Sequence, residues 1–396
     1  MLDTLQNIFL STYQKTPMTF KRYMHESLDM SDKLIGIIGS RGVGKTTFIL
    51  QYLKLLDIPF EKKLYFSADH FEVLRYSLYE IAEAFAKRGG EVLAIDEIHK
   101  YPNFEIELKS IYDTFDIRVI FSGSSALQLE HAKVDLSRRA VLYRIGGMSF
   151  REFIAYETGI TLKSYTLEDI LENHLSIALE INEKIKPFEF FENYLRYGYY
   201  PFYKQNKNLY AQKLEETISV ILENDLPLIF NIEAKNIYKL KKLLALLCES
   251  KPYELNITKL SMKIEINRNT LYHYLHYLQA GGLTHMVKQQ SKGDGILSKP
   301  EKLYLNNTNL SYAYCKEQER GTIREQFFTN QLQHKHTIHY SKVGDFIVDA
   351  KSIFEVGGKN KNFNQIKEVP NSYIASDDIL MGSGNKIPLW LFGFLY

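Results

Sequence analysis

Two stretches of the sequence carry residue types that handle phosphate groups. The first runs from Gly39 through Gly44 to Lys45 and Thr46, and it matches the pattern GxxxxGK(S/T). In that pattern the backbone N–H groups of a glycine-rich turn hold phosphate oxygens, the lysine reaches the β and γ phosphates, and the hydroxyl faces Mg²⁺. Because of this match we expect Mg-ATP to be bound by Gly39, Ser40, Arg41, Gly42, Val43, Gly44, Lys45, Thr46 and Thr47. The alternative is a glycine-rich turn that holds no ligand.

The second stretch is a pair of acids. Asp96 and Glu97 come directly after the apolar residues 92–95. A site that hydrolyses ATP needs such carboxylates, so we expect Asp96 to hold Mg²⁺ together with Thr46. We expect Glu97 to orient or deprotonate the attacking water. The alternative is that two acids at the end of a strand are only solvated.

Polar groups that could complete the site occur further along the chain. Ser124 follows the apolar residues 118–121, and we expect its hydroxyl to sense the γ-phosphate or to hold the water. Arg138 and Arg139 are the nearest pair of cations. An arginine can stabilise transition-state charge from the same chain or from a neighbouring subunit. A surface salt bridge is the alternative for these two arginines.

The elements that must position these groups can be read from the hydrophobic pattern. Short apolar runs, typical of buried parallel strands, alternate with amphipathic stretches at helical spacing. This order predicts a doubly wound α/β sheet. We expect strands at residues 34–38, 63–67, 92–95, 118–121 and 141–145, and helices at 46–56, 77–87 and 105–115.

Five strings in this order resemble the prokaryotic AAA-type ATPases that carry a helix-rich and nuclease-like C-terminal extension. They are GSRGVGKTT, LAIDEIHKYPN, FSGSSAL, DLSRRA and GMSFREF, and they cover residues 36–154, with the similarity continuing beyond them. The resemblance implies an AAA-like core in which an added strand lies between the strand before Gly39 and the strand before Asp96. It also implies that Glu97 is the catalytic glutamate and Ser124 a sensor.

The pattern changes after residue 148. Ser149 and Glu152 have capping-box spacing and open a long helical stretch, and residues 258–264 and 270–279 then read as a helix-turn-helix. The predicted fold is therefore an α/β P-loop core with a helical lid, a winged-helix module and a small C-terminal α/β nuclease-like domain. The expected divisions are a helical segment (1–30), the P-loop ATPase core (31–148), a helical lid or connector (149–250), a winged helix-turn-helix (251–292) and a restriction-endonuclease-like α/β domain (293–396).

The helix-turn-helix raises the question of DNA binding. Arg268 and Asn269 lie at the start of its second helix, where a DNA-reading helix presents its side chains. That helix holds several tyrosines and histidines but one arginine, which is a poor set of phosphate contacts. We expect a packing or regulatory module, with DNA as a less favoured partner.

The last region carries acids in an order similar to restriction-endonuclease-like folds: Glu325 on a helix, then Asp345, then Glu355. Such sites use an acid, a Glu-x-Lys sequence and Mg²⁺ to activate water on a phosphodiester. Here Gly357 stands where the lysine is expected, and the nearest ammonium is Lys359. Lys359 could take that role only if the strand bulges at Gly357. Otherwise the site is degenerate and the fold is kept for binding or packing.

Neither the histidines nor the cysteines have metal-ligand spacing. His334 and His336 alternate on what we expect to be a strand, without nearby acids or cysteines, and the pattern favours a solvated face. Cys248 and Cys315 lie in unrelated contexts without a CxxC motif. We expect two buried free thiols in a reducing compartment.

The composition narrows the function further. The 49 lysines and arginines nearly balance the 47 aspartates and glutamates, which removes the strong field of a dedicated nucleic-acid or membrane-surface protein. We find no leader sequence or membrane span, and expect a cytoplasmic protein.

We expect Mg-dependent ATP binding and slow, partner-stimulated hydrolysis, with ATP and ADP as ligands and a homo-oligomer or an unidentified protein as partner. The alternatives are an ATP-linked DNA-binding or nuclease factor and a non-hydrolysing nucleotide-gated switch.

Overall fold

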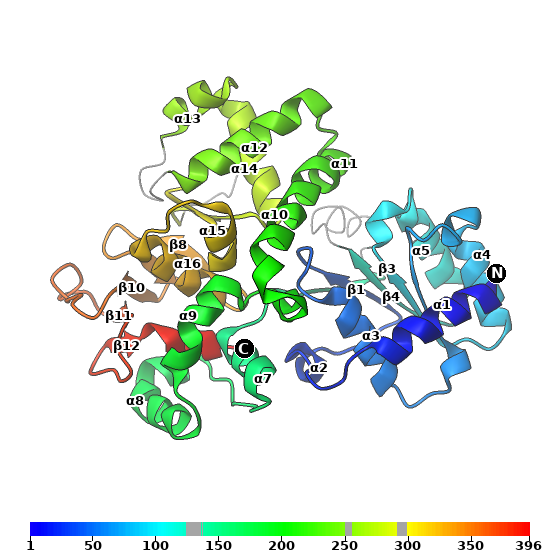
Figure 1. The fold of residues 1–396 in the computed structure, drawn as a ribbon, viewed down its shortest axis with the longest axis horizontal. Coiled ribbons are helices and arrows are strands. Elements are labelled where there is room, and N and C mark those ends of the chain that lie inside the picture. Colours follow the sequence, from blue (N-terminus) through cyan, green and yellow to red (C-terminus); the bar gives the residue numbers. More distant parts are fainter. Residues whose placement is uncertain (124–135, 137, 250–255, 291–298) are drawn as a thin grey trace. The chain divides into compact units, whose positions relative to one another are not determined.

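The computed structural model describes residues 1–123, 136, 138–249, 256–290 and 299–396. The chain forms two compact units, Met1–Gly147 and Met148–Tyr396, whose elements are labelled in Figure 1.

The first unit is built on a parallel five-stranded sheet with the strand order β2-β3-β4-β1-β5. The apolar runs predicted from the sequence form its strands, and β4 lies between β1 and β3, as the resemblance implied. The α/β prediction for this part of the chain is confirmed. The strands are β1 (Leu34–Ile38), β2 (Lys63–Ser67), β3 (Val92–Asp96), β4 (Arg118–Gly123) and β5 (Val141–Arg144).

Helices connect these strands and cover the sheet. From β1 the chain crosses the sheet to β2 at the edge, and from β2 it returns in the other direction through β3 to β4. Because the crossovers are right-handed, α3 lies on one face of the sheet and α4 and α5 lie on the other. Ser77 and Glu80 form a capping box that starts α4. The helices are α1 (Leu2–Lys15), α2 (Met24–Ser27), α3 (Lys45–Leu55), α4 (Leu78–Lys87) and α5 (Phe104–Thr114).

The core of this unit explains why its strands read as continuous apolar runs. All five residues of β1 and all five of β3 are buried, because helices cover both faces of the sheet. Phe85 of α4 and Leu108 of α5 belong to the hydrophobic cluster that these strands share. The sheet is therefore a rigid base from which the ends of β1 and β3 present polar residues.

The second unit begins with helices. Ser149 and Glu152 form the predicted capping box at the start of α7. Among the described residues, no strand occurs between α7 and β6, as the sequence predicted. The helices are α7 (Phe150–Thr158), α8 (Leu167–Lys184), α9 (Pro187–Tyr197), α10 (Tyr210–Val220), α11 (Leu226–Phe230) and α12 (Ala234–Cys248).

A helix-turn-helix and a hairpin follow. Helices α13 (Ile257–Ile264) and α14 (Arg268–Ala280) are joined by a short turn in which Glu265 is left-handed, with φ 60°. Gly282, with φ 72°, ends α14 and leads into the antiparallel pair β6 (Thr284–Val287) and β7 (Lys302–Leu305). The two helices lie where the sequence predicted a helix-turn-helix.

A second five-stranded sheet, in the order β12-β11-β10-β9-β8, fills the rest of the unit. Helix α16 packs on it, because the ring of Phe328 lies 5.7 Å from Phe346 and 5.0 Å from Phe354. The sequence did not predict α15, β11 or β12. The elements are α15 (Thr308–Tyr314), α16 (Arg320–Leu332), β8 (Ile338–Tyr340), β9 (Phe346–Val348), β10 (Ser352–Gly357), β11 (Ser372–Ser376) and β12 (Lys386–Pro388).

The C-terminal residues are part of the core of this unit. The backbone oxygen of Tyr396 accepts hydrogen bonds from Ser149 and from Arg151, at 2.9 and 2.8 Å. Phe150 of α7 also lies edge-to-face against Phe394. The first helix of the unit and its last residues therefore pack together, although the finer division of this part of the chain into three domains stays a prediction.

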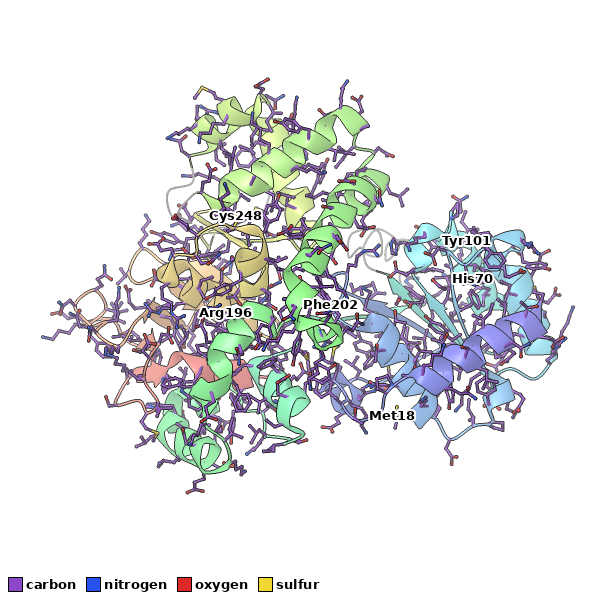
Figure 2. All side chains as sticks on the ribbon, viewed as in Figure 1. Met18, His70, Tyr101, Arg196, Phe202 and Cys248 are labelled. Carbon is purple, nitrogen blue, oxygen red and sulfur yellow. A yellow bond between two sulfur atoms is a disulfide. The ribbon has the colours of Figure 1, made fainter. Side chains whose placement is uncertain are left out.

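The cysteines are paired, contrary to the expectation of free thiols. Cys248 ends α12 and Cys315 follows α15, and the two form a disulfide with Cα atoms 5.2 Å apart; Cys248 is labelled in Figure 2. The pairing was not visible in the sequence because 67 residues separate the two cysteines and only the fold brings the two helix ends together. No helix among the described residues is long and apolar enough to cross a membrane.

Candidate nucleotide site

The loop after β1 can adopt its shape only with glycine at three positions. A Cβ atom on Gly39 would lie 2.2 Å from the backbone oxygen of Ile145, so no side chain fits there. Gly42 and Gly44 have φ angles of 87° and 98°, a left-handed conformation that favours glycine. The loop then enters α3 at Lys45, which turns the N-terminal N–H groups of that helix toward the loop.

Lys45 is buried, and its ammonium lies inside the loop. Its Nζ donates to the backbone oxygens of Gly39 and Ser40, at 2.9 and 3.0 Å. The side chain has a relative exposure of 5%. A buried ammonium needs acceptors, and phosphate oxygens entering the loop would be stronger acceptors than these carbonyl groups.

Asp96, at the end of β3, is held by donors from three other elements. Thr46 Oγ1, in the first turn of α3, donates to Asp96 Oδ2 at 2.5 Å, and the hydroxyl of Tyr65 on β2 donates to the same oxygen at 2.9 Å. Ser122 on β4 donates to Oδ1. Burial and the charge of Asp96 raise the pKa of Tyr65 well above its ordinary value, so this hydroxyl keeps its proton. Asp96 is therefore fixed in orientation beside Thr46.

Glu97 leaves the strand in a different direction from Asp96. Its φ angle is 52°, a left-handed conformation that is uncommon and costly for a residue other than glycine. Its carboxylate lies among three basic side chains, with Oε2 at 3.9 Å from Arg41, 3.7 Å from His99 Nε2 and 3.5 Å from Lys100. The strained turn thus separates the carboxylate of Glu97 from that of its neighbour.

Lys100 joins Glu97 to a further acid. Its ammonium also pairs with Asp69, which follows β2. Burial by itself lowers the pKa of Lys100, but the hydrogen bond to Asp69 and the charge of Glu97 together raise it above its ordinary value. Lys100 therefore stays charged and holds Glu97 in place.

Two residues that contact Asp96 were not chosen from the sequence, although the hydroxyls of the string that holds Ser122 were expected at this edge. Ser122 belongs to the same FSGSSAL string as Ser124, but Ser124 lies outside the described residues. Tyr65 lies on β2, directly beside β3 in the sheet. Both residues could have been found from the strand order, because a polar residue near the end of a parallel strand next to β3 lies at the same edge of the sheet. The sequence alone does not show which strands lie next to β3.

The two candidate arginines do not reach this site within the chain. Val141 pairs with Ile35, so β5 begins beside the start of β1, at the edge of the sheet opposite Gly39. Arg138 and Arg139 come directly before this start. Arg139 forms two hydrogen bonds of 3.0 Å with the carboxylate of Asp113, as the salt-bridge alternative predicted, and Arg138 is exposed.

The acids predicted for a nuclease-like site in the second unit do come together. Lys302 on β7 lies 3.0 Å from the carboxylate of Glu325 and 2.8 Å from that of Asp345. Glu355, on β10, pairs with Lys361. The hydroxyl of Tyr304 also donates to Glu325. No motif in the sequence points to Lys302 or Lys361.

Lys359 is not the lysine that faces Glu355. Its side chain is exposed, and its backbone oxygen accepts a hydrogen bond of 2.6 Å from Lys386. A Cβ atom added to Gly357 would lie 2.8 to 3.0 Å from three side-chain carbons of Lys361. The side chain of Lys361 therefore occupies the space that a side chain at position 357 would take, and the expectation for Lys359 was wrong.

The histidine prediction also needs correction. His334 and His336 lie in the turn before β8, which begins at Ile338, so they do not share the face of a strand. His336 has an acidic partner, because its Nδ1 lies 2.6 Å from Asp349. Within the described part of the chain, no group of three histidine, cysteine or acidic residues is arranged to hold a metal ion.

Two family models match parts of the chain. Residues 31–154 match a family model described as an AAA domain, and residues 188–320 match a domain of unknown function (DUF8612). The parallel sheet and the loop at Gly39 agree with the first match, so this unit resembles the core of P-loop ATPases. The winged-helix and nuclease-like parts are not identified by these models.

Individual relatives add little about function. An uncharacterized protein of Methanocaldococcus jannaschii is 29% identical over 328 residues, covering 76% of this chain and 69% of the relative. Among solved structures, the AMPPCP-bound DnaA of Aquifex aeolicus matches with a TM-score of 0.27 and 15% identity, over 69% of this chain and 88% of that one. A DNA replication initiation factor matches with a TM-score of 0.27 and 13% identity, over 70% and 88%. TM-scores this low carry no argument.

Proposed function

We propose that the first unit binds Mg-ATP in the loop from Gly39 to Thr47 and hydrolyses it slowly. The observation that carries the proposal is the contact between Thr46 and Asp96, 2.5 Å long, with Glu97 directly beside it. The AAA-domain match of residues 31–154 supports ATP as the ligand. The geometry of the site supports the roles proposed for the single residues.

The site has the chemistry that Mg²⁺ requires. The hydroxyl of Thr46 and the carboxylate of Asp96 are oxygen ligands, which a hard cation prefers, and they already meet at one point. When bound there, Mg²⁺ would neutralise charge on the β and γ phosphates. Tyr65 and Ser122 keep the carboxylate of Asp96 oriented and so act as positioning residues.

The phosphates would be held by the loop and by α3. Lys45 would exchange the backbone oxygens of Gly39 and Ser40 for β and γ phosphate oxygens, and the N-terminal N–H groups of α3 would point at the same negative charge. Three glycines keep the loop open enough for this approach. Binding therefore requires only a local change at Lys45.

Glu97 is the candidate general base, and its surroundings favour slow hydrolysis. To accept a proton from water, its carboxylate must be free to approach that water. Arg41 and Lys100 lie beside the carboxylate, at 3.9 and 3.5 Å, and compete with the water for it. We propose that a partner speeds hydrolysis by drawing these cations away from Glu97.

Completion of the site by a second chain is part of the proposal. Arg138 is exposed and lies at the edge of the sheet opposite the loop, so it cannot reach the nucleotide of its own chain. An arginine supplied by a neighbouring subunit can stabilise the transition state in such enzymes. We therefore propose a homo-oligomer in which Arg138 faces the nucleotide of the next chain, whereas Arg139 is held by Asp113.

We propose that the second unit is the part of the molecule that contacts a partner. Helices α13 and α14 with the hairpin β6–β7 have the order of a winged helix-turn-helix, and α16 with the second sheet has the order of a nuclease-like fold. Arg268, Asn269 and His273 are exposed along the start of α14, which keeps DNA binding as a second candidate function. The single arginine among them argues for weak binding.

Phosphate release from ATP is the direct test. We expect slow release in the presence of Mg²⁺, none with EDTA, and an increase when the protein is concentrated enough to associate. Sizing chromatography in ATP and in ADP shows whether the nucleotide changes the oligomeric state. A parallel assay with DNA addresses the second candidate, since stimulation by DNA would make DNA the partner. Nucleotide binding without any phosphate release would instead identify a non-hydrolysing switch.

A further inference from the structure

Three carboxylates converge in the interior of the second unit. Glu325 comes from α16, Asp345 from the turn before β9, and Glu355 from β10. Lys302 contacts both Glu325 and Asp345, and Asp345 Oδ2 accepts a hydrogen bond of 2.9 Å from the backbone N–H of Val356, the residue after Glu355. Such a group needs positive charge, since buried carboxylates that face each other repel.

Lys302 brings that charge from outside the sheet. It lies on β7, in the hairpin that follows the helix-turn-helix, and its Nζ is 3.0 Å from Glu325 and 2.8 Å from Asp345. Tyr304, two residues further along the same strand face, donates its hydroxyl to Glu325. Strand β7 thus presents an ammonium and a hydroxyl to the same acids.

The ammonium of Lys302 has a third contact besides the two carboxylates. Its Nζ lies 4.6 Å from the ring centroid of Phe346, a cation–π contact. The side chain has a relative exposure of 5%. Burial alone lowers the pKa of Lys302, but the charges of Glu325 and Asp345 outweigh it and hold the pKa above the ordinary value. Lys302 is therefore a charged group without contact to bulk water.

Lys361 differs from Lys302 in each of these respects. Its ion pair is with one carboxylate, that of Glu355, its side chain is 34% exposed, and it approaches over Gly357. Lys361 therefore neutralises a single carboxylate from a partly exposed position. Lys302 links two carboxylates that belong to different elements, which is the arrangement that a metal ion makes when it bridges acidic ligands.

We propose that Lys302 is the resident cation of this centre. Its ammonium fills the position between Glu325 and Asp345 that a divalent metal ion would need, so the native chain holds no metal there. The same contact fastens hairpin β6–β7 to α16 and the second sheet. The ammonium of Lys302 thereby prevents a metal ion from binding between Glu325 and Asp345. The two carboxylates become a divalent-cation site only when this ammonium is removed.

The test is Mn²⁺ binding by the full chain without nucleotide, followed by the electron paramagnetic resonance signal of free Mn²⁺. Lys302→Met removes the charge and keeps the length and much of the volume of the side chain. We expect this variant to bind about one Mn²⁺ more than the native chain, with a Kd of about 10⁻³ M or tighter. The extra ion should disappear when Asp345→Asn is added to Lys302→Met.

Lys361→Met is the matched control, because it removes an ammonium from the same cluster and leaves Lys302 in place. It should bind no more Mn²⁺ than the native chain. Equal Mn²⁺ binding by Lys302→Met, folded by circular dichroism, and the native chain would overturn the proposal. Asp345→Asn alone decides the matter if Lys302→Met does not fold: unchanged Mn²⁺ binding supports the proposal, and loss of an ion from the native level overturns it.

Discussion

Thr46 at the start of α3 and Asp96 at the end of β3 are joined by a hydrogen bond of 2.5 Å, although β4 separates β3 from the strand that leads to Thr46. The contact exists because parallel strands end at one edge of the sheet, where the loop after β1 and the end of β3 meet. It brings the hydroxyl of the phosphate loop to the carboxylate at which Mg²⁺ is expected.

Lys45→Ala is expected to weaken ATP binding by about 10- to 100-fold or more, because it removes a charge-assisted contact with the phosphates. The affinity can be measured with a fluorescent ATP analogue. Lys54→Ala is the matched control, since Lys54 lies on the same helix and donates to the backbone oxygen of Thr16. Equal loss of affinity in both variants would point to damage to α3 and not to a phosphate contact.

Glu97→Gln is expected to keep ATP binding and to lower kcat by about 10² to 10⁴, the usual contribution of a general base. Phosphate release measures the rate, and the fluorescent analogue measures binding. Glu91→Gln serves as the control, because Glu91 pairs with Lys62 at the start of β3, the strand end far from Thr46. Normal turnover by Glu97→Gln would refute the role given to Glu97.

Tyr65→Phe should raise the Mg²⁺ concentration that gives half-maximal ATPase activity, by about 10-fold, since it removes one of the groups that orient Asp96. The maximal rate at saturating Mg²⁺ should change less. Tyr143→Phe is the control, because Tyr143 lies in the same sheet and donates to the backbone oxygen of Asp29. A lower maximal rate with an unchanged Mg²⁺ requirement would contradict this positioning role.

The parts of the fold that the sequence predicted are those determined by local pattern. The strands β1 and β3 are buried along their whole length, so each reads as an apolar run bounded by polar residues. The loop at Gly39 and the acids after β3 follow from motif and strand order in the same way. In the second unit β11 and β12 were missed, since β12 has only three residues and carries no alternation that could be recognised.

The partners of the site residues could not be predicted, because they depend on contacts between distant segments. Ser122 and Tyr65 became relevant to Asp96 only once β2 and β4 were known to flank β3. Lys302 is 23 residues from Glu325 and 43 from Asp345 in the sequence, and no motif relates them. The sequence showed Gly357 where a lysine is expected and Lys359 as the nearest ammonium, but only the path of the loop after β10 shows that Lys361 faces Glu355.

Reduction of the disulfide is expected to destabilise the second unit. The bond closes a segment of 67 residues, for which the chain-entropy model gives about 4 kcal/mol. The only tryptophan, Trp390, is buried in this unit, so its fluorescence during urea unfolding reports on it. A reducing agent should lower the urea midpoint of the native chain and leave that of the Cys248→Ser, Cys315→Ser double variant unchanged. Two free thiols in the untreated, denatured chain would show that the bond does not form.

His285 on β6 should contribute to the way the free energy of unfolding of the second unit changes with pH. Burial lowers the pKa of His285 from 6.5 to about 4, and its Nε2 has no hydrogen-bond partner among the described residues. As the pH falls below 6.5, His285 takes up a proton in the unfolded chain but stays neutral in the folded one until about pH 4. The unfolded state therefore binds more protons in this window. The stabilising contribution is complete above pH 6.5 and is lost on acidification, by on the order of 2 kcal/mol.

His285→Phe isolates this contribution from that of the many carboxylates that also titrate in acid. Phenylalanine keeps a ring in the same space and cannot take up a proton, so the variant should lose about 1 to 2 kcal/mol less than the native chain between pH 7 and pH 5. Urea unfolding followed by Trp390 at the two pH values gives both numbers. His273→Phe, at an exposed position on α14, should match the native chain. An equal loss in the native chain and in His285→Phe would mean that His285 is protonated as readily in the folded unit as in the unfolded chain, and hence that its ring has access to water.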